Sequence, residues 1–386
     1  MAKRNLKPAS YFQDPKQPPL IYDIKKSWEK VISKPPIWLS NKFPALPKEK
    51  KFKFLGNKLI SPIAIAAGPA SGQLWTDFYF KMGFGMVVQK TRRTVPRMSN
   101  KEPNIAIVHQ ENPVSRPHLD DSLSATINPQ DWNDYKSMTN SFGNPSSDIL
   151  TWANELPEQR KVIKDGQILA CSVTATTPDK GQGYGGVFSK NNPEALIIET
   201  AADLLIGATA AVLGGANVVE LNLACPNVTE NPQEGEMFQD TKLVKYVLSE
   251  FKRRFPKIPV GIKFGVFKSK EQMKKVFYTA GDNLNYVSGI NALKMTVLAK
   301  DGSDILPGRK SSGVCGIADQ QIALEHIKWA SEIRKEEGLK YEILGGGGII
   351  NASDVNKFLS EGADMVQVAA VALADPLIAY KYRLEK

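Results

Sequence analysis

The stretch Leu344–Ile349 (LGGGGI), near the end of this 386-residue chain, decides between the two α/β folds that the rest of the sequence allows. A second turn, Val366–Ala370 (VQVAA), follows about twenty residues later. Backbone N–H groups exposed by glycines and by helix N-termini bind phosphate, and the turns after strands seven and eight are the usual phosphate site of a (β/α)8 barrel. A doubly wound sheet would carry its glycine-rich turn after the first strand, where this sequence has no GxGxxG. The stretch therefore favours the barrel.

Short apolar runs alternate with longer amphipathic ones from Leu55 onward, which is the pattern of repeated βαβ units. Eight such runs are the number that a closed barrel needs, so the sequence predicts an α/β protein with a (β/α)8 TIM barrel over residues 56–386. The expected strands are Ile63–Ala67, Gly85–Lys90, Gln167–Val173, Ala216–Leu221, Val260–Phe264, Tyr286–Asn291, Glu342–Gly346 and Ala363–Val368. The expected helices are 192–213, starting at Asn192 and Pro193, then Glu236–Arg254, Lys270–Ala280, Asp319–Glu337 and Ser353–Glu361.

The positive charge of the chain lies in its first 58 residues. They hold 14 Lys/Arg against 4 Asp/Glu, which accounts for the formal net charge of +10 of the whole chain. The remainder is electrically balanced, which argues against a nucleic-acid partner for the barrel. Eight of the 25 prolines also lie in this part. We therefore expect residues 1–55 to form a basic extension outside the barrel.

Within the extension, apolar residues recur at helical spacing from Ile21 to Ile32, with lysines between them. One interpretation is a helix that makes peripheral contact with an anionic membrane, near a lipid-soluble electron acceptor. The other is a helix packed across the end of the barrel, and we favour it because surface helices of this pattern are common. The apolar positions are Ile21, Ile24, Trp28, Val31 and Ile32.

Composition places the chain in the ordinary globular range, with 42% hydrophobic and 23% charged residues. Cys171, Cys225 and Cys315 make no CxxC pair, so we expect no disulfide framework, no metal site and a cytoplasmic setting. We expect no signal peptide and no membrane span, since the most apolar long segment, 196–216, contains two acidic residues and is typical of a packed helix.

The segment Thr94–Met138 interrupts the βα alternation. It is rich in Pro, Asn and Asp, and only Ile105–His109 has the pattern of a strand. A loop of this length in a compact domain is usually a lid, a binding surface or a dimer contact, and the sequence does not choose among them.

The strongest chemical signal is Glu220–Asn227 (ELNLACPN), at the end of an expected strand and so on the catalytic face of a barrel. A thiol such as Cys225 can act as a base, because its ordinary pKa of about 8.5 can be lowered by nearby cations. The carboxamides of Asn222 and Asn227 both donate and accept hydrogen bonds, as the edge of a pyrimidine ring requires. A small buried cysteine beside a turn is the alternative.

Four further polar residues stand where expected strands end. Asn140 and Asn291 would complete an uncharged recognition set, although such asparagines singly are more often turn or cap residues. Lys90 closes the second strand, and Lys263 lies within an apolar one. A buried lysine is costly unless paired, so an anionic partner is implied: a flavin edge or a substrate carboxylate.

Together these motifs resemble the FMN-dependent dihydroorotate dehydrogenase family, in its soluble class with a cysteine base, over roughly Leu55 to Tyr380. The resemblance depends on the combination of motifs and on their order along the chain, because each motif alone is weak evidence. The motifs are Ala66-Ala67-Gly68, Lys90-Thr91, Asn140–Gly143, Asn222–Asn227, Lys263, Asn291, Gly313–Gly316 and Gly347-Gly348.

The resemblance implies that Cys225 takes the proton from C5 of dihydroorotate while C6 passes hydride to N5 of FMN. Lys90 would reach both the substrate carboxylate and the flavin, and Lys263 would stabilise the reduced flavin. The pyrimidine would be held by Asn140, Asn222, Asn227 and Asn291. FMN would be lined by Ala67, Gly68, Lys90, Thr91, Asn222, Lys263, Gly316, Gly347, Gly348, Ala369 and Ala370.

Two positions differ from the family pattern. Ala369-Ala370 stand where the family usually has Gly-Thr, which removes one hydroxyl contact to the phosphate, and Ala292 stands where a substrate-contacting serine is usual. These differences leave open an enzyme for another dihydropyrimidine or for dihydrouridine in tRNA, and a non-catalytic flavin-binding or pyrimidine-binding sensor. The electron acceptor also stays open between fumarate, a quinone and a nicotinamide used through a partner subunit. A homodimer is implied by resemblance alone.

Overall fold

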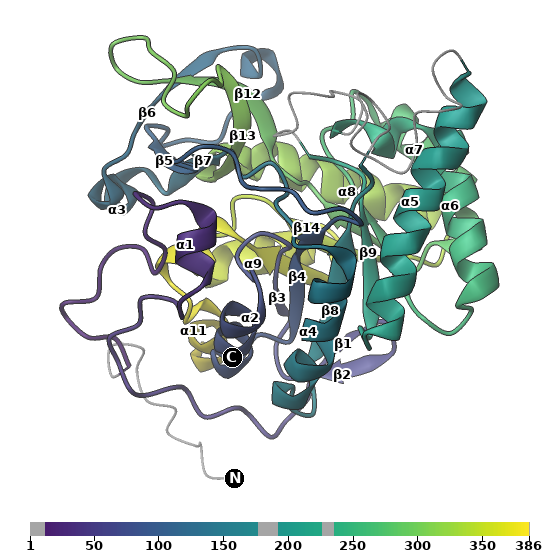
Figure 1. Cartoon of the computed structure of the whole chain (residues 1–386), viewed down its shortest axis with the longest axis horizontal. Coiled ribbons are helices and arrows are strands. Elements are labelled where there is room, and N and C mark those ends of the chain that lie inside the picture. The colour runs from purple at the N-terminus through teal and green to yellow at the C-terminus, as the bar shows by residue number, and fades with distance from the viewer. Residues whose placement is uncertain (1–11, 177–191, 226–234, 386) are drawn as a thin grey trace.

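The computed structural model describes residues 12–176, 192–225 and 235–385. Within them, eight parallel strands close a barrel in chain order, which is the arrangement of a (β/α)8 barrel (Figure 1). The strands are β3 (Ile63–Ile65), β4 (Met86–Arg92), β8 (Ile168–Val173), β9 (Val218–Asn222), β10 (Val260–Lys263), β11 (Tyr286–Gly289), β14 (Glu342–Gly346) and β15 (Met365–Val368). All eight predicted strands are confirmed, with ends that differ by no more than two residues.

Helices cover the outside of the barrel. The predicted helix after Asn192 is confirmed as α5, and the Asn192 side chain caps it by accepting from the N–H groups of Glu194 and Ala195. The helix expected from Glu236 begins later, at Thr241, because residues 237–239 form a separate 3-10 turn and Asp240 caps α6. The barrel helices are α2 (Gln73–Lys81), α4 (Ile149–Val162), α5 (Pro193–Leu213), α6 (Thr241–Arg254), α7 (Lys270–Ala280), α8 (Gln320–Glu336), α9 (Ala352–Ser360), α10 (Ala370–Ala374) and α11 (Ile378–Leu384).

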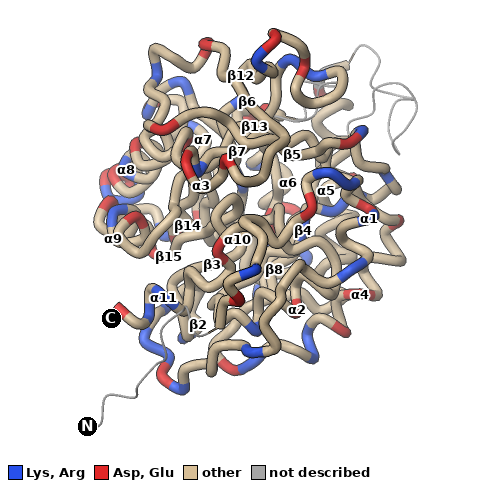
Figure 2. Tube along the Cα trace, turned by 90° about the vertical axis from the view of Figure 1, so that its left-hand side faces the viewer, with Lys and Arg blue, Asp and Glu red and all other residues tan. Residues whose placement is uncertain are grey.

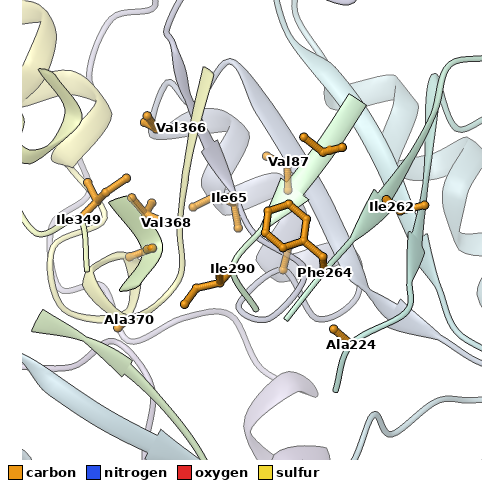
Figure 3. Packing of buried hydrophobic residues seen from close by; sticks show 14 of the residues in the cluster. Ile65, Val87, Ala224, Ile262, Phe264, Ile290, Ile349, Val366, Val368 and Ala370 are labelled. Carbon is orange, nitrogen blue, oxygen red and sulfur yellow. The ribbon is translucent and has the colours of Figure 1, made fainter. Parts of the chain in front are cut away.

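Helix α5 is the one helix of the described residues that is long and apolar enough, by length and composition alone, to cross a membrane. It packs against α4 and α6 and against strands β8 and β9, as a barrel helix does. The outward-facing residues of the strands, such as Val87, Ile262 and Val366, form a buried apolar core (Figure 3). Basic and acidic residues are interspersed over the described chain (Figure 2).

A second sheet lies beside the mouth of the barrel and corrects the expectation of one strand within Thr94–Met138. That segment contributes three strands, and two more come from the chain after β11. The sequence pattern missed them because β6 is polar and because the sheet pairs β6 with β12, far away along the chain. The strands are β5 (Ile105–Val108), β6 (Ser122–Thr126), β7 (Ser137–Asn140), β12 (Leu293–Leu298) and β13 (Ser311–Gly316).

The N-terminal segment packs on the barrel, as the favoured interpretation predicts. Its apolar residues are buried, among them Ile21, Ile24 and Trp28. The predicted helix is too long, since only Trp28–Ile32 is helical (α1). The backbone N–H of Ile21 instead donates to the carbonyl of Leu373, 2.6 Å away, which ties the start of the segment to α10.

The inside of the barrel has two parts. Around the amino ends of the strands, a separate apolar cluster includes Ala64, Met86 and Tyr286, and we call it the lower interior. Phe54 closes it from below, on the hairpin of β1 (Phe52–Phe54) and β2 (Asn57–Leu59). The inward-facing residues nearer the carboxyl ends are polar, and we call them the upper interior: Lys90, Ser172, Asn222, Lys263, Ser288 and Gln367.

Candidate active site

A pocket of about 940 Å³ opens at the carboxyl ends of the barrel strands, between the upper interior and the N-terminal segment. A second pocket, of about 400 Å³, shares six of its lining residues and extends toward the turn after β14. Predicted site residues that line the first pocket are Ala67, Gly68, Lys90, Asn140, Asn222, Cys225, Lys263, Asn291, Ala369 and Ala370. The second adds Gly316, Gly347 and Gly348. The structure thus brings most of the predicted residues into one elongated cavity.

Cys225 follows β9 directly and is buried, with 6% of its surface exposed. It lines the same pocket as Lys90, and the charge interaction between the two groups favours the ammonium form of Lys90. Asn227, the other predicted residue of this motif, lies outside the described residues. The pocket therefore holds a thiol together with a buried cation, which is the combination that a cysteine base requires.

Asparagine side chains next to Cys225 are held by one another and by their neighbours. Asn222 donates to the hydroxyl of Thr91 at 2.9 Å, and Asn291 donates to the carboxamide oxygen of Asn222 at 3.3 Å and to the carbonyl of Ala224. Thr91, predicted to line the cofactor, is behind Asn222 instead and does not line either pocket of the described residues. Its hydroxyl fixes the orientation of the Asn222 carboxamide.

Lys90 is a buried cation among other cations. Burial lowers its pKa from 10.5 to about 8; Cys225 opposes this shift, whereas Arg92, Arg93 and Lys263 add to it. Its ammonium donates to the side-chain oxygen of Asn144 at 3.3 Å. An anionic ligand in the pocket would relieve the repulsion among these groups, so the site is electrostatically suited to a carboxylate.

Lys263 projects from β10 into the barrel. Burial lowers its pKa, and the charge of the buried Glu220 opposes this. Its ammonium donates to the side-chain oxygen of Gln367 at 2.8 Å, and Gln367 in turn donates to Ser288 at 2.8 Å. This chain of hydrogen bonds holds the Lys263 ammonium at the junction of the two pockets.

Sequence reasoning missed two polar partners of the lysines, Asn144 and Gln367. Gln367 could have been found from the same signal as Lys263, because it interrupts an apolar strand at an inward-facing position. Asn144 has a φ of 52°, a left-handed conformation that asparagine tolerates better than most residues. An Asn-Pro pair after glycine predicts a turn but does not predict which lysine the turn contacts.

The glycines after β14 form a cradle at the far end of the cavity. Gly347 and Gly348 have φ values of 126° and 70°. A Cβ atom at either position would lie within 2.5 Å of the Cβ of Ala323 or Gln320 in α8. Only glycine lets this turn approach the start of α8 so closely, which leaves backbone groups exposed to a ligand.

Aromatic residues of the N-terminal segment form part of the pocket wall, which sequence reasoning also missed. Tyr22, Trp28 and Ile32 line it together with Trp75 and Phe142. The Trp28 indole donates to Ser71 at 3.2 Å, and the backbone N–H of Trp28 donates to Asn104 at 3.3 Å. In the described ranges of the chain, no group of three or more His, Cys, Asp or Glu is placed to hold a metal ion.

Comparison with known proteins identifies the family. The model of the dihydroorotate dehydrogenase family matches residues 128–383. A protein named dihydroorotate dehydrogenase from Dictyostelium discoideum is 30% identical over 378 residues, which cover 94% of this chain and 96% of the relative. The chain belongs to the dihydroorotate dehydrogenase family.

Other members of the dihydroorotate dehydrogenase family match over a shorter range. The catalytic subunit of NAD(+)-dependent dihydroorotate dehydrogenase B from Oceanobacillus iheyensis is 27% identical over 164 residues, 42% of this chain and 50% of the subunit. Among solved structures, dihydroorotate dehydrogenase from Eimeria tenella in complex with ferulenol superimposes with a TM-score of 0.66. That match covers 89% of this chain and 85% of the other at 14% identity, so it supports the fold alone.

Proposed function

We propose that this chain oxidises dihydroorotate to orotate in pyrimidine biosynthesis, with FMN as its cofactor. One observation carries the proposal: Cys225, Lys90 and the paired Asn222 and Asn291 face one buried pocket that continues, past Lys263, to a glycine cradle. The reaction makes the chain an oxidoreductase acting on a CH–CH bond, in agreement with its family.

The residues present fit FMN. The two adjoining pockets would hold a ring system near Lys90 and a phosphate near Gly347 and Gly348, and a Cβ at either glycine would collide with α8. Lys263 and Gln367 stand between these ends, where a flavin ring would present its polar edge. When bound, FMN supplies the acceptor for the hydride from C6 of the substrate.

Substrate binding follows from charge and hydrogen-bond capacity. The Lys90 ammonium binds the carboxylate of dihydroorotate, which is the anion that the surrounding cations favour. Carboxamides of Asn140, Asn222 and Asn291 line the pocket and supply its uncharged polar groups. One N–H of Asn222 is used by Thr91 and both N–H groups of Asn291 are directed at Asn222 and Ala224, so the second N–H of Asn222 and the side-chain oxygen of Asn291 would bond the ring amides and carbonyls. Asn222 is oriented by Thr91, so its position is fixed before the substrate arrives.

Proton transfer falls to Cys225. Its thiolate accepts the proton from C5 and becomes a neutral thiol, while the electron pair of the C5–H bond forms the new C5=C6 bond. The Lys90 ammonium, which lines the same pocket, is the cation that such a base requires nearby. Burial of Cys225 and the aromatic wall at Trp28 and Phe142 exclude water from this step.

The test is anaerobic addition of dihydroorotate to the purified, FMN-loaded protein, followed by the absorbance of the flavin band. We expect rapid bleaching in the wild type and a rate lower by about 10²–10⁴-fold at neutral pH in Cys225→Ser, since a serine hydroxyl is a far weaker base. Cys171→Ser is the matched control: Cys171 is buried in β8, bonds Gln89 and lies outside the pocket, so this variant should bleach like the wild type.

Equal rates in Cys225→Ser and wild type would remove Cys225 from the mechanism. A flavin-loaded wild type that does not bleach with dihydroorotate, at any pH, would contradict the proposed substrate, and other dihydropyrimidines would then be tried. Absence of bound flavin after incubation with FMN would contradict the proposal as a whole.

A further inference from the structure

The glycine cradle contains a buried acid that the proposed reaction does not use. Asp319 immediately precedes α8, only 1% of its surface is exposed, and it lines the second pocket with Gly316, Gly347 and Gly348. A Cβ atom placed on Gly347 would be 3.3 Å from one of its carboxyl oxygens. The carboxyl group therefore lies against the turn that we assign to phosphate.

Neither oxygen of this carboxyl group has a hydrogen-bond partner of standard geometry among the described residues. The backbone N–H groups of Gly316, Gly348 and Asp319 itself are near enough to favour its charge, but burial outweighs them and raises its pKa well above the usual range. A buried polar group without a partner costs free energy, and a ligand that supplies the partner recovers it.

Few ionisable groups face Asp319 within the described residues. Cys315 approaches from β13, and the pKa of its thiol is raised by burial and then by the Asp319 charge. Lys263, from β10, lines the same pocket, but its ammonium already donates to Gln367. Apart from burial, the groups that act on the charge of Asp319 are backbone N–H groups, and no charged side chain of the described residues is among them.

Among the described residues, the two that follow β15 at the cradle bring no side-chain donor. Ala369 and Ala370 line the pocket where the phosphate is expected, and alanine offers only backbone groups there. A neutral carboxylic acid has one O–H donor, whereas a carboxylate has none. A phosphate monoester carries a charge of about −1.5 to −2 at pH 7, so it would be repelled by the carboxylate and bonded by the acid.

We propose that Asp319 is part of the phosphate-binding site and, as a neutral carboxylic acid, donates a hydrogen bond to the phosphate of the bound flavin. The inference rests on the proposed FMN site. Since the ionised form repels the ligand, FMN binding takes up a proton wherever free Asp319 is ionised, and FMN affinity falls as pH rises. Riboflavin has the same ring system and no phosphate, so its binding is independent of Asp319.

The experiment uses flavin-free full-length protein titrated with FMN and with riboflavin from pH 6 to 9, with flavin fluorescence as the signal. We expect the ratio of FMN affinity to riboflavin affinity to fall with rising pH in the wild type, by up to about tenfold per pH unit above the pKa of Asp319. Asp319→Asn keeps a donor and removes the charge. In this variant the ratio of FMN affinity to riboflavin affinity should not change with pH once the phosphate has lost its second proton, near pH 6, and it should exceed the wild-type ratio at every pH where free Asp319 is ionised.

Asp354→Asn is the matched control. Asp354 is equally buried, but it pairs with Lys357, accepts from the backbone of Ile350 and does not line the pocket. In Asp354→Asn the ratio of FMN affinity to riboflavin affinity should change with pH as it does in the wild type. Calorimetry of the wild type in two buffers of different ionisation enthalpy should show proton uptake with FMN that rises toward one proton as pH rises, and none with riboflavin.

The possible results distinguish a failure of the Asp319 inference from a failure of the proposed function. An Asp319→Asn ratio equal to the wild-type ratio at every pH overturns the inference, and so does a wild-type ratio that falls with rising pH without proton uptake on FMN binding. This second measurement holds even if the variant does not fold. A wild type that binds neither flavin overturns the proposed function instead.

Discussion

The lower and upper interiors of the barrel are built from the same strands, but the lower interior is apolar and the upper interior is polar and lines the ligand pocket. On β4, Val88 belongs to the apolar cluster, and Lys90, the next inward-facing residue, lines the ligand pocket. On β15 the same step leads from Met365 to Gln367. The change within one step along a strand shows that stability and ligand binding are divided between the two ends, as in other (β/α)8 barrels.

The largest effect on stability is expected at the lower end. Phe54 is fully buried against Tyr286, with ring centroids 5.8 Å apart. Phe54→Ala should lower the free energy of unfolding by about 3–5 kcal/mol, because it leaves a cavity beneath the barrel, while the turnover number of the folded enzyme stays unchanged. Denaturant titration and steady-state kinetics measure the two quantities.

Leu213→Ala is the control for this comparison, since Leu213 is 78% exposed at the end of α5 and its replacement should change stability by less than about 0.5 kcal/mol. A large loss of turnover in folded Phe54→Ala would show that the two ends are coupled, which contradicts the division.

At the upper end the sign of the stability change should reverse. Lys90→Met removes a buried cation whose pKa is lowered to about 8, mainly by burial. At pH 7 the flavin-free variant should be more stable than the wild type by about 2–3 kcal/mol, and its KM for dihydroorotate should rise by at least about 30-fold.

The pH dependence tests the cause. Between pH 8 and 10.5 the unfolded chain binds more protons at Lys90 than the folded chain does, so the free energy of unfolding of the wild type should rise with pH. The difference in free energy of unfolding between Lys90→Met and the wild type should therefore shrink over that interval. If that difference in free energy of unfolding does not change with pH, or if the variant is less stable than the wild type, the Lys90 ammonium is well paired in the flavin-free protein.

The smallest effect should come from the one hydroxyl of the lower interior. The phenol of Tyr286 donates to the carbonyl of Val219 across 3.5 Å, which is the limit of a hydrogen bond. Tyr286→Phe should therefore cost less than about 1 kcal/mol of stability and leave turnover unchanged. A larger loss would show that polar contacts also hold the lower interior together.

The barrel could be predicted from sequence because each strand is a short apolar run between helical patterns, and alternation needs no long-range information. The second sheet could not, since β13 pairs with β7, and the pattern of either strand alone does not identify such a distant partner. The length of α1 was wrong for a related reason. Ile21 and Ile24 are buried at helical spacing, but backbone contacts with α10 and with Ile37 hold Ile21 outside a helix.

In the candidate site, too, the sequence predicted residues with a local signal and missed those placed by long-range packing. Residues at strand ends, such as Lys90, Asn222 and Cys225, could be assigned to one mouth because a parallel barrel directs all carboxyl ends to the same face. Trp28 and Asp319 could not, since their place in the cavity depends on how a loop and a helix start pack against distant turns. Nothing in the local sequence of either residue indicates a ligand.

The hydrogen bond between Ile21 and Leu373 joins two segments that lie far apart along the chain. During synthesis Trp28 can dock once Ser71 and Asn104 have been made, but Ile21 finds its partner only after α10 has been made. Until then the apolar residues around Ile21 lack part of their packing surface, and unpaired apolar segments are prone to aggregate. The N-terminal part of the pocket wall is therefore complete only after the barrel strands have been synthesised.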